Sequence, residues 1–341
     1  MKMTRPDATP LEGRTQSDTG SIGNSSQLAP AETASLEHYL RAASSDNTRK
    51  AYRSAIRQFE RWGGRLPSHA HELVRYLIEQ APRLNTRTLD LHLTAIGQWH
   101  RYQGLYNPVD EPLVRKTMEG MRRTHGTKKQ KATPLRLEHI AQMLGFLKSL
   151  PESNKKARDT ALILVAYFGA FRRSELTSIS AEHVRWENEG LIIHLPRSKT
   201  DQHGSGIERA LPHSNKPTCP VCALKAWMLK ANITHGPVFR PINRWDQVLE
   251  NALNGGAINA LLKNLGRACQ FEFADQLSSH SFRRGLSTSA ARANVDFALI
   301  KKQGGWKHDA TVWEYIEEGR RFVDNAAAPL MNLLDDMLAK K

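Results

Sequence analysis

The sequence is poor in cysteine, in acidic residues relative to basic ones, and in long apolar runs. Three cysteines among 341 residues are too few for a disulfide framework, which favours a reducing compartment such as the cytoplasm. No apolar run approaches the roughly 18 residues that a membrane-spanning helix needs, and residues 1–30 contain no apolar segment of the kind that a signal peptide carries. We therefore expect a cytoplasmic protein that does not act at a membrane.

The shortage of acidic residues indicates a class of partner. Lys and Arg number 49 against 34 Asp and Glu, which gives a net charge of +15. A protein with this excess is a candidate binder of a polyanion, because neutralising phosphate groups releases condensed counterions. A basic protein with no nucleic-acid role would have the same composition, so the charge alone does not decide the matter.

Two of the three cysteines lie in the sequence C-P-V-C at residues 219–222. A C-x-x-C pair can be half of a zinc site or a redox pair, but no second pair follows and Cys269 stands alone. The simpler prediction is a turn and the first residues of a helix that continues through residues 223–230. We predict no metal and no other cofactor, while metal binding by Cys219 and Cys222 stays open at this stage.

The first third of the chain has a purely helical pattern. Residues 1–33 are rich in Ser, Thr, Gly and Pro and are expected to form a disordered leader. Residues 34–123 then place apolar side chains at helical spacing with no strand-like alternation, which predicts a small helical bundle. Its main helices are expected around residues 52–62 (capped at Asn47-Thr48), 71–79, 85–102 and 111–123.

A basic stretch follows the bundle. Five of the ten residues from 122 to 131 are Lys or Arg, so we expect residues 124–133 to be an extended interdomain linker. A second domain at residues 134–325 mixes helices with a hairpin, whose strands are expected at 190–195 and 207–211. The tail, residues 326–341, contains a short amphipathic helix. The fold class is thus mainly α with a small β-sheet in the second domain.

Two adjacent arginines in the second domain are hard to explain by a structural role alone. Arg172 and Arg173 directly follow a helix whose second half is apolar and is expected to be buried. A desolvated guanidinium must be paired or must face an anionic ligand. Glu175, three residues after Arg172, is placed to pair with it.

A second cluster of polar residues lies about a hundred residues later. His280 and Arg283 are three residues apart, and if Ser281 N-caps a helix, both lie at its first turn and can face one anion. Two glycines and Trp306 follow, and Tyr315 comes nine residues after that Trp. Imidazole, guanidinium, indole N–H and phenol can then converge on a single phosphate. Each residue alone is ordinary, and the order and spacing carry the signal.

This order resembles the tyrosine recombinase (phage integrase) family, and the catalytic half is most similar to the Cre-type recombinases, which also carry Trp before the Tyr. The resemblance covers roughly residues 35–335. It implies a SAM-like helical core-binding domain followed by an α+β catalytic domain. By this likeness Glu175 supports the active site, and the catalytic residues are Arg172, Lys199, His280, Arg283, Trp306 and Tyr315.

The resemblance also implies a mechanism. A phenol with an ordinary pKa of about 10 is a weak nucleophile, so concentrated positive charge must stabilise the transition state when Tyr315 forms a 3′-phosphotyrosyl bond. The two catalytic arginines would hold the non-bridging oxygens, because their planar forks match phosphate geometry. His280 would exchange a proton, Lys199 would protonate the departing 5′ oxygen, and Trp306 would donate its indole N–H. No carboxylate cluster suggests a two-metal site, so a metal-free mechanism fits.

The implied substrate is double-stranded DNA with inverted-repeat sites, bound by a homodimer on each site and a tetramer in synapsis. The tail helix would dock into a neighbouring protomer, with packing on its own domain as the alternative. Residues of the first domain and of the linker would contact the DNA, and they are Arg49, Arg87, Thr88, Arg123, Lys128, Lys129 and Lys131.

Two other functions remain open. A type IB topoisomerase shares this chemistry but acts as a monomer, and the tail helix and the all-helical first domain favour recombination over it. A non-catalytic DNA-binding protein on the same scaffold is the other alternative, which the complete set of expected catalytic residues argues against.

Overall fold

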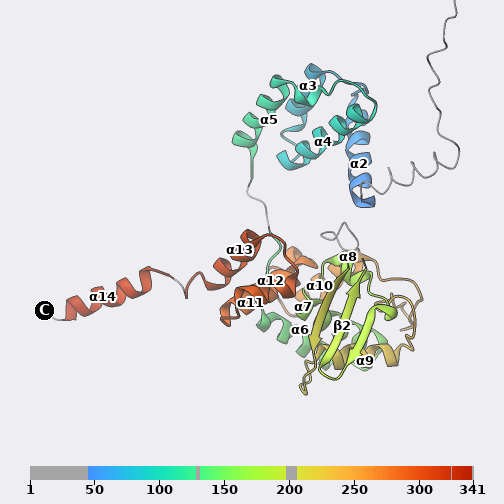
Figure 1. Cartoon of the computed structure of the whole chain (residues 1–341), viewed down its shortest axis with the longest axis vertical. Helices are drawn as coiled ribbons and strands as arrows, with labels where there is room; N and C mark the ends of the chain where they lie inside the picture. Colours follow the sequence, from blue (N-terminus) through green and yellow to red (C-terminus); the bar gives the residue numbers. More distant parts are fainter. Residues whose placement is uncertain (1–44, 128–130, 197–205, 324, 340–341) are drawn as a thin grey trace, which may run out of the picture. The chain divides into compact units, whose positions relative to one another are not determined.

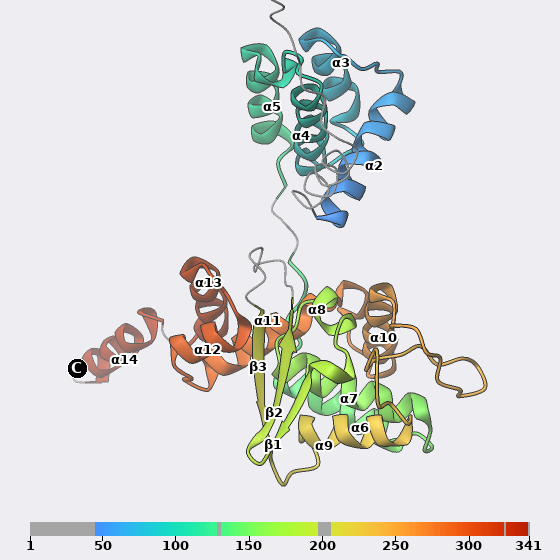
Figure 2. The same ribbon diagram turned by 45° about the vertical axis from the view of Figure 1, so that its right-hand side comes forward.

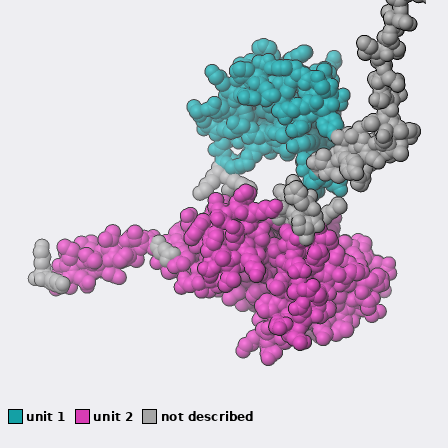
Figure 3. All heavy atoms as spheres, in the orientation of Figure 1, with its two compact units in different colours: residues 1–129 teal, residues 130–341 magenta. Residues whose placement is uncertain are grey.

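The computed structural model describes residues 45–127, 131–196, 206–323 and 325–339. These fall into two compact units, within residues 1–129 and 130–341, and each unit has a hydrophobic core of its own (Figures 1 and 3). None of the described helices is both long and apolar enough to cross a membrane. The described residues are mainly helical with one small antiparallel sheet, as the sequence predicts.

The first unit is a helical bundle. Its elements are α2 (Asp46–Trp62), α3 (Ala70–Gln80), α4 (Thr86–Tyr102), a 3-10 turn η1 (Pro108–Asp110) and α5 (Pro112–His125). The expected cap of the first helix was wrong, because α2 starts earlier: the Ser45 hydroxyl accepts the Thr48 N–H at 3.2 Å. The expected end is confirmed, since Gly63 closes α2 with a φ of 109°.

The basic stretch after the bundle begins inside a helix. Arg122, Arg123 and His125 belong to the last turn of α5, so the helix continues to His125, whereas an extended chain was expected from residue 124 onward. Cationic side chains interact favourably with the carbonyl end of a helix, which gives a local reason for the extra turn. Lys128 and Lys129 lie outside the described residues.

The second unit packs helices around a three-stranded antiparallel sheet in the order β1-β2-β3 (Figure 2). Three short turns, η2 (Ala181–His183), η3 (Ala274–Gln276) and the β1–β2 connection, link its longer elements. The longer elements are α6 (Leu137–Ser149), α7 (Asn154–Phe168), α8 (Arg173–Thr177), β1 (Val184–Glu187), β2 (Gly190–Leu195), β3 (Ile207–Pro212), α9 (Pro220–Lys230), α10 (Gly255–Ala268), α11 (His280–Arg292), α12 (Phe297–Gly304), α13 (Asp309–Arg320) and α14 (Ala327–Ala339).

The predicted hairpin is present as β2 and β3. Gly190 pairs with Pro212 and Leu195 with Ile207, so the strands run antiparallel in one continuous register. The sequence did not predict β1, because its four residues are mostly exposed and lack the alternation of a half-buried strand. The turn between β2 and β3, residues 197–205, lies outside the described residues.

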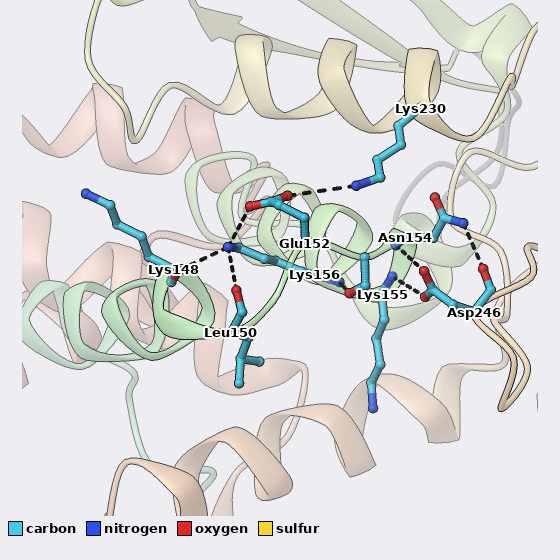
Figure 4. Close-up of polar contacts among 9 residues, drawn as sticks. Lys148, Leu150, Glu152, Asn154, Lys155, Lys156, Lys230 and Asp246 are labelled. Carbon is cyan, nitrogen blue, oxygen red and sulfur yellow. Dashed lines mark hydrogen bonds and ion pairs between the residues drawn. The ribbon is translucent and has the colours of Figure 1, made fainter.

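Polar contacts fix the start of α7, the buried helix that leads to Arg172 (Figure 4). The Asp246 carboxylate accepts the first two backbone N–H groups of α7 at 2.7 and 3.0 Å. The Lys156 ammonium donates to two carbonyl oxygens at the end of α6, at 3.0 and 2.8 Å, and to Glu152 at 2.7 Å. Because these contacts satisfy the free groups of both helix ends, α7 is held at a fixed position in the core.

The start of α11 differs from the prediction. Ser281 is not the N-cap, because His280 is already the first helical residue and Ser279 occupies the cap position. The Ser281 hydroxyl instead accepts the Ser278 N–H at 3.1 Å, and its carbonyl accepts the Leu135 N–H at 3.0 Å. The helix is thereby tied to the first residues of the second unit.

Gly285 is a position where α11 has no room for a side chain. A Cβ there would lie 1.7 Å from the Leu135 carbonyl oxygen, which belongs to backbone and cannot rotate away. We expect Gly285→Ala to lower the free energy of unfolding by about 3 kcal/mol.

The matched control is Gly145→Ala in α6, where a Cβ would meet nothing within 4 Å. This variant should raise the free energy of unfolding by about 0.5–1 kcal/mol, because alanine favours a helix more than glycine does. Denaturant unfolding of the full chain measures both changes. Equal effects of the two substitutions would contradict the close approach of α11 to Leu135.

Candidate active site

Arg172 is held by a buried carboxylate at the start of α8. Its backbone N–H donates to Glu175 Oε2 at 2.8 Å, and its Nη1 donates to Glu175 Oε1 at 2.5 Å. Glu175 is 2% exposed, so the pair lies in a region of low dielectric. The adjacent Arg173 is exposed. This geometry favours Arg172 over Arg173 as the arginine that faces the site.

Arg283 is buried beside the same turn. Its Nη1 donates to the carbonyl oxygen of Ala170, a residue with a φ of 47° in the turn between α7 and α8. Burial lowers the pKa of Arg283 to about 10, and the nearby charge of Arg172 acts in the same direction. The guanidinium carbon lies 4.5 Å from the ring centroid of Trp306, which is a cation–π distance.

Tyr315 reaches the site from α13. Its side chain is 5% exposed, its ring centroid lies 5.6 Å from that of Trp306, and its hydroxyl lies 3.5 Å from Nε2 of His280. His280 itself is exposed at the first turn of α11, so it borders both the tyrosine and the solvent. α11, α12 and α13 lie side by side in both ribbon views (Figures 1 and 2).

The phenol of Tyr315 resists ionisation in this structure. Burial raises its pKa, the positive charges of Arg283 and Arg284 oppose the rise, and Glu314 and Glu318 add to it. Burial prevails, so at neutral pH the hydroxyl carries its proton. A nucleophile in this state needs a base to take that proton as the new bond forms.

Trp306 depends on a glycine for its position. A Cβ at Gly304 would lie 1.6 Å from the indole ring, so the ring packs directly on the backbone at the end of α12. Gly305 follows with a φ of 60°, a conformation that favours glycine. The two glycines that the sequence analysis placed before Trp306 therefore have a packing reason.

Arg209 is a residue that the sequence analysis missed. It lies on β3 with only 4% of its surface exposed, and neither Nε nor Nη2 has a hydrogen-bond partner among the described residues. Burial lowers its pKa, with Glu175 opposing and Arg172 adding to the shift. Its charge also acts on Arg283, so the guanidinium groups of Arg172, Arg209 and Arg283 form one cationic centre.

A sequence signal for Arg209 does exist. On β3, residues 207, 209 and 211 share one face of the strand, and Leu211 on that face is buried. An arginine on the inward face of a short strand is unusual, because it buries a charge unless an anion or a carboxylate meets it. This alternation is visible in the sequence of residues 207–211.

Arg284, next to Arg283, has a different surrounding. Its Nη2 pairs with Glu318 on α13, and its Nη1 donates to the carbonyl oxygen of Ala132. The side chain thus joins α11, α13 and the first residues of the second unit. The pair with Glu318 links the helix that carries His280 to the helix that carries Tyr315.

The expected DNA-contacting residues of the first unit lie on α2 and α4, which pack together. Arg49 pairs with Asp46 on α2. Arg87 is exposed, and its Nη2 donates to the Thr127 carbonyl oxygen at 2.9 Å. Thr88 is half-buried beside it. Exposed ion pairs contribute roughly 1 kcal/mol or less, so a phosphate can displace the carboxylate.

Two residues of the basic stretch also pair with carboxylates. Arg123 contacts Glu119 on α5, and Lys131 contacts Glu314, the residue before Tyr315. Lys199, like Lys128 and Lys129, lies outside the described residues. The structure therefore brings together Arg172, Glu175, His280, Arg283, Trp306 and Tyr315, with Arg209 in addition.

A second missed feature is a cationic stripe on α2. Lys50, Arg53, Arg57 and Arg61 follow one another at three- and four-residue intervals and line one shallow hollow of about 200 Å³. At this spacing they occupy a single face of the helix. None of these four residues is among the DNA-contacting residues expected from the sequence.

A helical unit that precedes an α+β unit, with cations gathered around a tyrosine, is the arrangement of an enzyme that acts on phosphodiesters. The model of the phage integrase family matches residues 134–320. An integrase/recombinase xerD homolog of Selenomonas ruminantium is 34% identical over 303 residues, which cover 86% of this chain and 88% of the homolog. The chain belongs to the phage integrase family, the tyrosine recombinases, and is a site-specific DNA recombinase.

Further relatives share the sequence or the fold. The recombinase Cre of Escherichia phage P1 is 25% identical over 325 residues, or 87% of this chain and 90% of Cre. The Tn1549 transposon integrase, solved in complex with transposon right end DNA, superposes with a TM-score of 0.57 at 14% identity, over 87% of this chain and 98% of that one. The mainly helical fold with a small sheet is that of these enzymes.

Arg209→Met separates a structural from an electrostatic role. Because methionine removes a buried charge whose Nε and Nη2 lack partners among the described residues, we expect the free energy of unfolding to stay the same or rise. We expect covalent cleavage of a DNA substrate to slow by about 10²–10³-fold, as when one donor to a developing oxyanion is removed.

The control is Arg185→Met on the neighbouring strand β1, whose side chain is 62% exposed. This variant should change neither the free energy of unfolding nor the rate of covalent cleavage. Chemical denaturation and a single-turnover cleavage assay provide the two measurements. Normal cleavage by Arg209→Met would remove Arg209 from the site.

Proposed function

We propose that this recombinase cleaves and rejoins DNA strands through Tyr315. The phenol oxygen attacks the scissile phosphorus, a 3′-phosphotyrosyl ester forms, and the bond between phosphorus and the 5′ oxygen breaks. A 5′ hydroxyl of a DNA strand later attacks the ester and releases the tyrosine. The observation that carries the proposal is the position of the Tyr315 hydroxyl, 3.5 Å from His280 Nε2 and beside the pair of Trp306 and Arg283.

The neighbouring side chains have complementary roles in this proposal. His280 Nε2 accepts the phenol proton, which burial otherwise keeps on the oxygen. Arg172 and Arg283 bind the non-bridging oxygens, and Glu175 holds Arg172 in place. Trp306 forms an apolar side of the site and donates its indole N–H to the phosphate. Lys199, which lies outside the described residues, protonates the departing 5′ oxygen.

The proposed substrate is double-stranded DNA with inverted-repeat sites. Two protomers occupy one site, and four assemble when two sites meet. The cationic stripe on α2, the start of α4 and the basic stretch from 122 to 131 supply contacts to phosphates. Solved relatives bound to DNA, among them the Tn1549 integrase, support the choice of partner.

The tail helix α14 supports the proposed assembly. It is apolar along one side and none of its described residues is buried. We propose that this face docks on a neighbouring protomer. The proposal also separates a recombinase from a type IB topoisomerase, because a topoisomerase acts as a monomer and would form no complex of two DNA duplexes in a sedimentation experiment.

Tyr315→Phe tests the nucleophile. With a nicked suicide substrate, from which the cleaved strand end diffuses away, the parent enzyme should accumulate a covalent adduct visible on a denaturing gel. The variant should bind the same DNA with unchanged affinity, yet form adduct at least about 10⁴-fold more slowly, because no other group supplies the attacking oxygen.

Tyr167→Phe is the matched control, because Tyr167 is buried in the same unit and its hydroxyl contacts Ser289 at 3.0 Å, away from the site. This variant should still form the adduct. A covalent complex that still forms with Tyr315→Phe would rule out Tyr315 as the nucleophile. A parent enzyme that binds DNA but never forms an adduct would favour a non-catalytic DNA-binding protein.

Charge neutralisation tests the basic stretch. Replacing Arg123, Lys128, Lys129 and Lys131 with Gln should make the dependence of log K on log salt shallower by about 0.9 for each phosphate contact that is lost. Salt titrations of DNA binding, followed by fluorescence anisotropy, measure this slope.

A control of equal charge replaces four exposed lysines of α6, α7 and α9 with Gln, namely Lys148, Lys155, Lys225 and Lys230. It should leave the slope unchanged. If both quadruple variants change the slope equally, the effect comes from net charge, and the basic stretch makes no direct contact.

A further inference from the structure

Three side chains with metal-ligating atoms meet where β3 leads into α9. They are His213, one residue after the strand, Cys219 at the N-cap of the helix, and Cys222 in its first turn. Their ligand atoms all lie within 4.8 Å of one another, and Nε2 of His213 is 3.4 Å from Sγ of Cys222. The sequence analysis considered only the two cysteines and had no means of placing His213 beside them.

The spacing of these atoms suits a zinc ion. Tetrahedral zinc has Zn–S bonds of about 2.3 Å and Zn–N bonds of about 2.0–2.1 Å, so neighbouring ligand atoms are about 3.6–3.8 Å apart. The His213–Cys222 pair, at 3.4 Å, is close to that separation. His213 and Cys222 are exposed, and small rotations of their side chains can close the remaining gap of about 1 Å to Cys219.

The backbone prepares Cys219 for this role. Its side chain is fully buried, and its sulfur accepts the backbone N–H groups of Cys222 and Ser214, each at 3.4 Å. N–H groups directed at a sulfur stabilise the charged thiolate, which is the form that binds metal. Cys219 is thus a fixed ligand, and the two exposed residues are adjustable ones.

We propose that His213, Cys219 and Cys222 bind one zinc ion per chain, with water as the fourth ligand. Two thiolates and one imidazole are ligands that zinc prefers over magnesium or calcium, which take oxygen. The two thiols release their protons to solvent on binding. The open position faces a surface groove of about 460 Å³ that His213 and Cys222 line together with Glu187 and Lys225.

The position of the ion suggests what it does. It joins the end of β3 to the start of α9, and α8 and α9 lie at opposite ends of the strands (Figures 1 and 2). The ion therefore lies away from Arg172 and Tyr315, and its role is structural. It fixes the outgoing end of β3, the strand that carries Arg209, and closes the seven-residue segment from His213 to Cys219 into a loop.

Metal titration of the full-length chain tests the proposal. After chelation and dialysis under a phosphine reductant, the protein should take up one equivalent of Zn²⁺. Co²⁺ in its place should give a thiolate-to-cobalt charge-transfer band and the intense visible bands of a tetrahedral site. Zn²⁺ should also raise the unfolding midpoint, because it binds the folded state.

Cys222→Ser is the decisive variant, because Cys222 is exposed and its replacement leaves the buried Cys219 in place. The affinity of this variant for zinc should fall by more than ~10–100-fold. A loss of that size is typical when only an outer hydrogen-bond partner of a metal ligand is removed, and here a ligand itself is lost. The control is Cys269→Ser, which removes the remaining cysteine and should retain the full stoichiometry and the cobalt spectrum. Circular dichroism of each variant confirms that it is folded.

Three results would overturn the proposal. The first is a reduced protein that binds less than one equivalent of zinc. The second is a cobalt complex without the thiolate charge-transfer band, and the third is a Cys222→Ser variant that binds zinc as tightly as the parent protein. A Cys219–Cys222 disulfide that forms readily, together with no zinc uptake after reduction, would assign the pair to redox chemistry instead. Each readout is independent of strand cleavage, so the proposed recombinase mechanism stands or falls separately.

Discussion

The candidate active site depends on one buried carboxylate among three guanidinium groups. Glu175 bonds Arg172 directly, and its negative charge also acts on Arg209 and Arg283. Three positive charges and one negative charge leave two positive charges in a region with little water. A pentacoordinate phosphorus formed from a phosphodiester carries roughly two negative charges, so the centre is matched to the transition state more closely than to the singly charged substrate.

This arrangement explains why the surrounding fold is so tightly specified. Like charges repel strongly at low dielectric; burial, with the charge of Arg172 acting in the same direction, lowers the pKa of Arg283 to about 10. The protein tolerates the repulsion because rigid neighbours oppose it: the carbonyl of Ala170, the ring of Trp306 and the helix packing at Gly285. Stability and activity therefore make opposite demands on the same residues, as is common where a site is organised before its ligand arrives.

Much of this site was predictable, and the reasons for the failures are physical. The pair of Arg172 and Glu175 was predictable because an ion pair three residues apart is local. Tyr315 was singled out by the resemblance to the tyrosine recombinases, which supplies its interval from Trp306. The cap at Ser281 was wrong, because α11 begins at His280 and the Ser281 hydroxyl accepts the Ser278 N–H instead. Arg209 and His213 were missed for a different reason, since the groups around them lie on other strands and helices. The catalytic role of Lys199 stays a prediction, because this residue lies outside the described residues.

The packing of α13 on α11 bears on which subunit supplies the nucleophile to each set of arginines. A Cβ at Gly319 would lie 2.6 Å from the Thr288 carbonyl oxygen, so the backbones of the two helices approach each other directly just beyond Tyr315. On the proposed mechanism, each subunit therefore brings its nucleophile to its own arginines. Two inactive subunits, one lacking the phenol and one lacking Arg172, would not complement each other in a mixed assembly. Inactivation would instead scale with the fraction of defective chains.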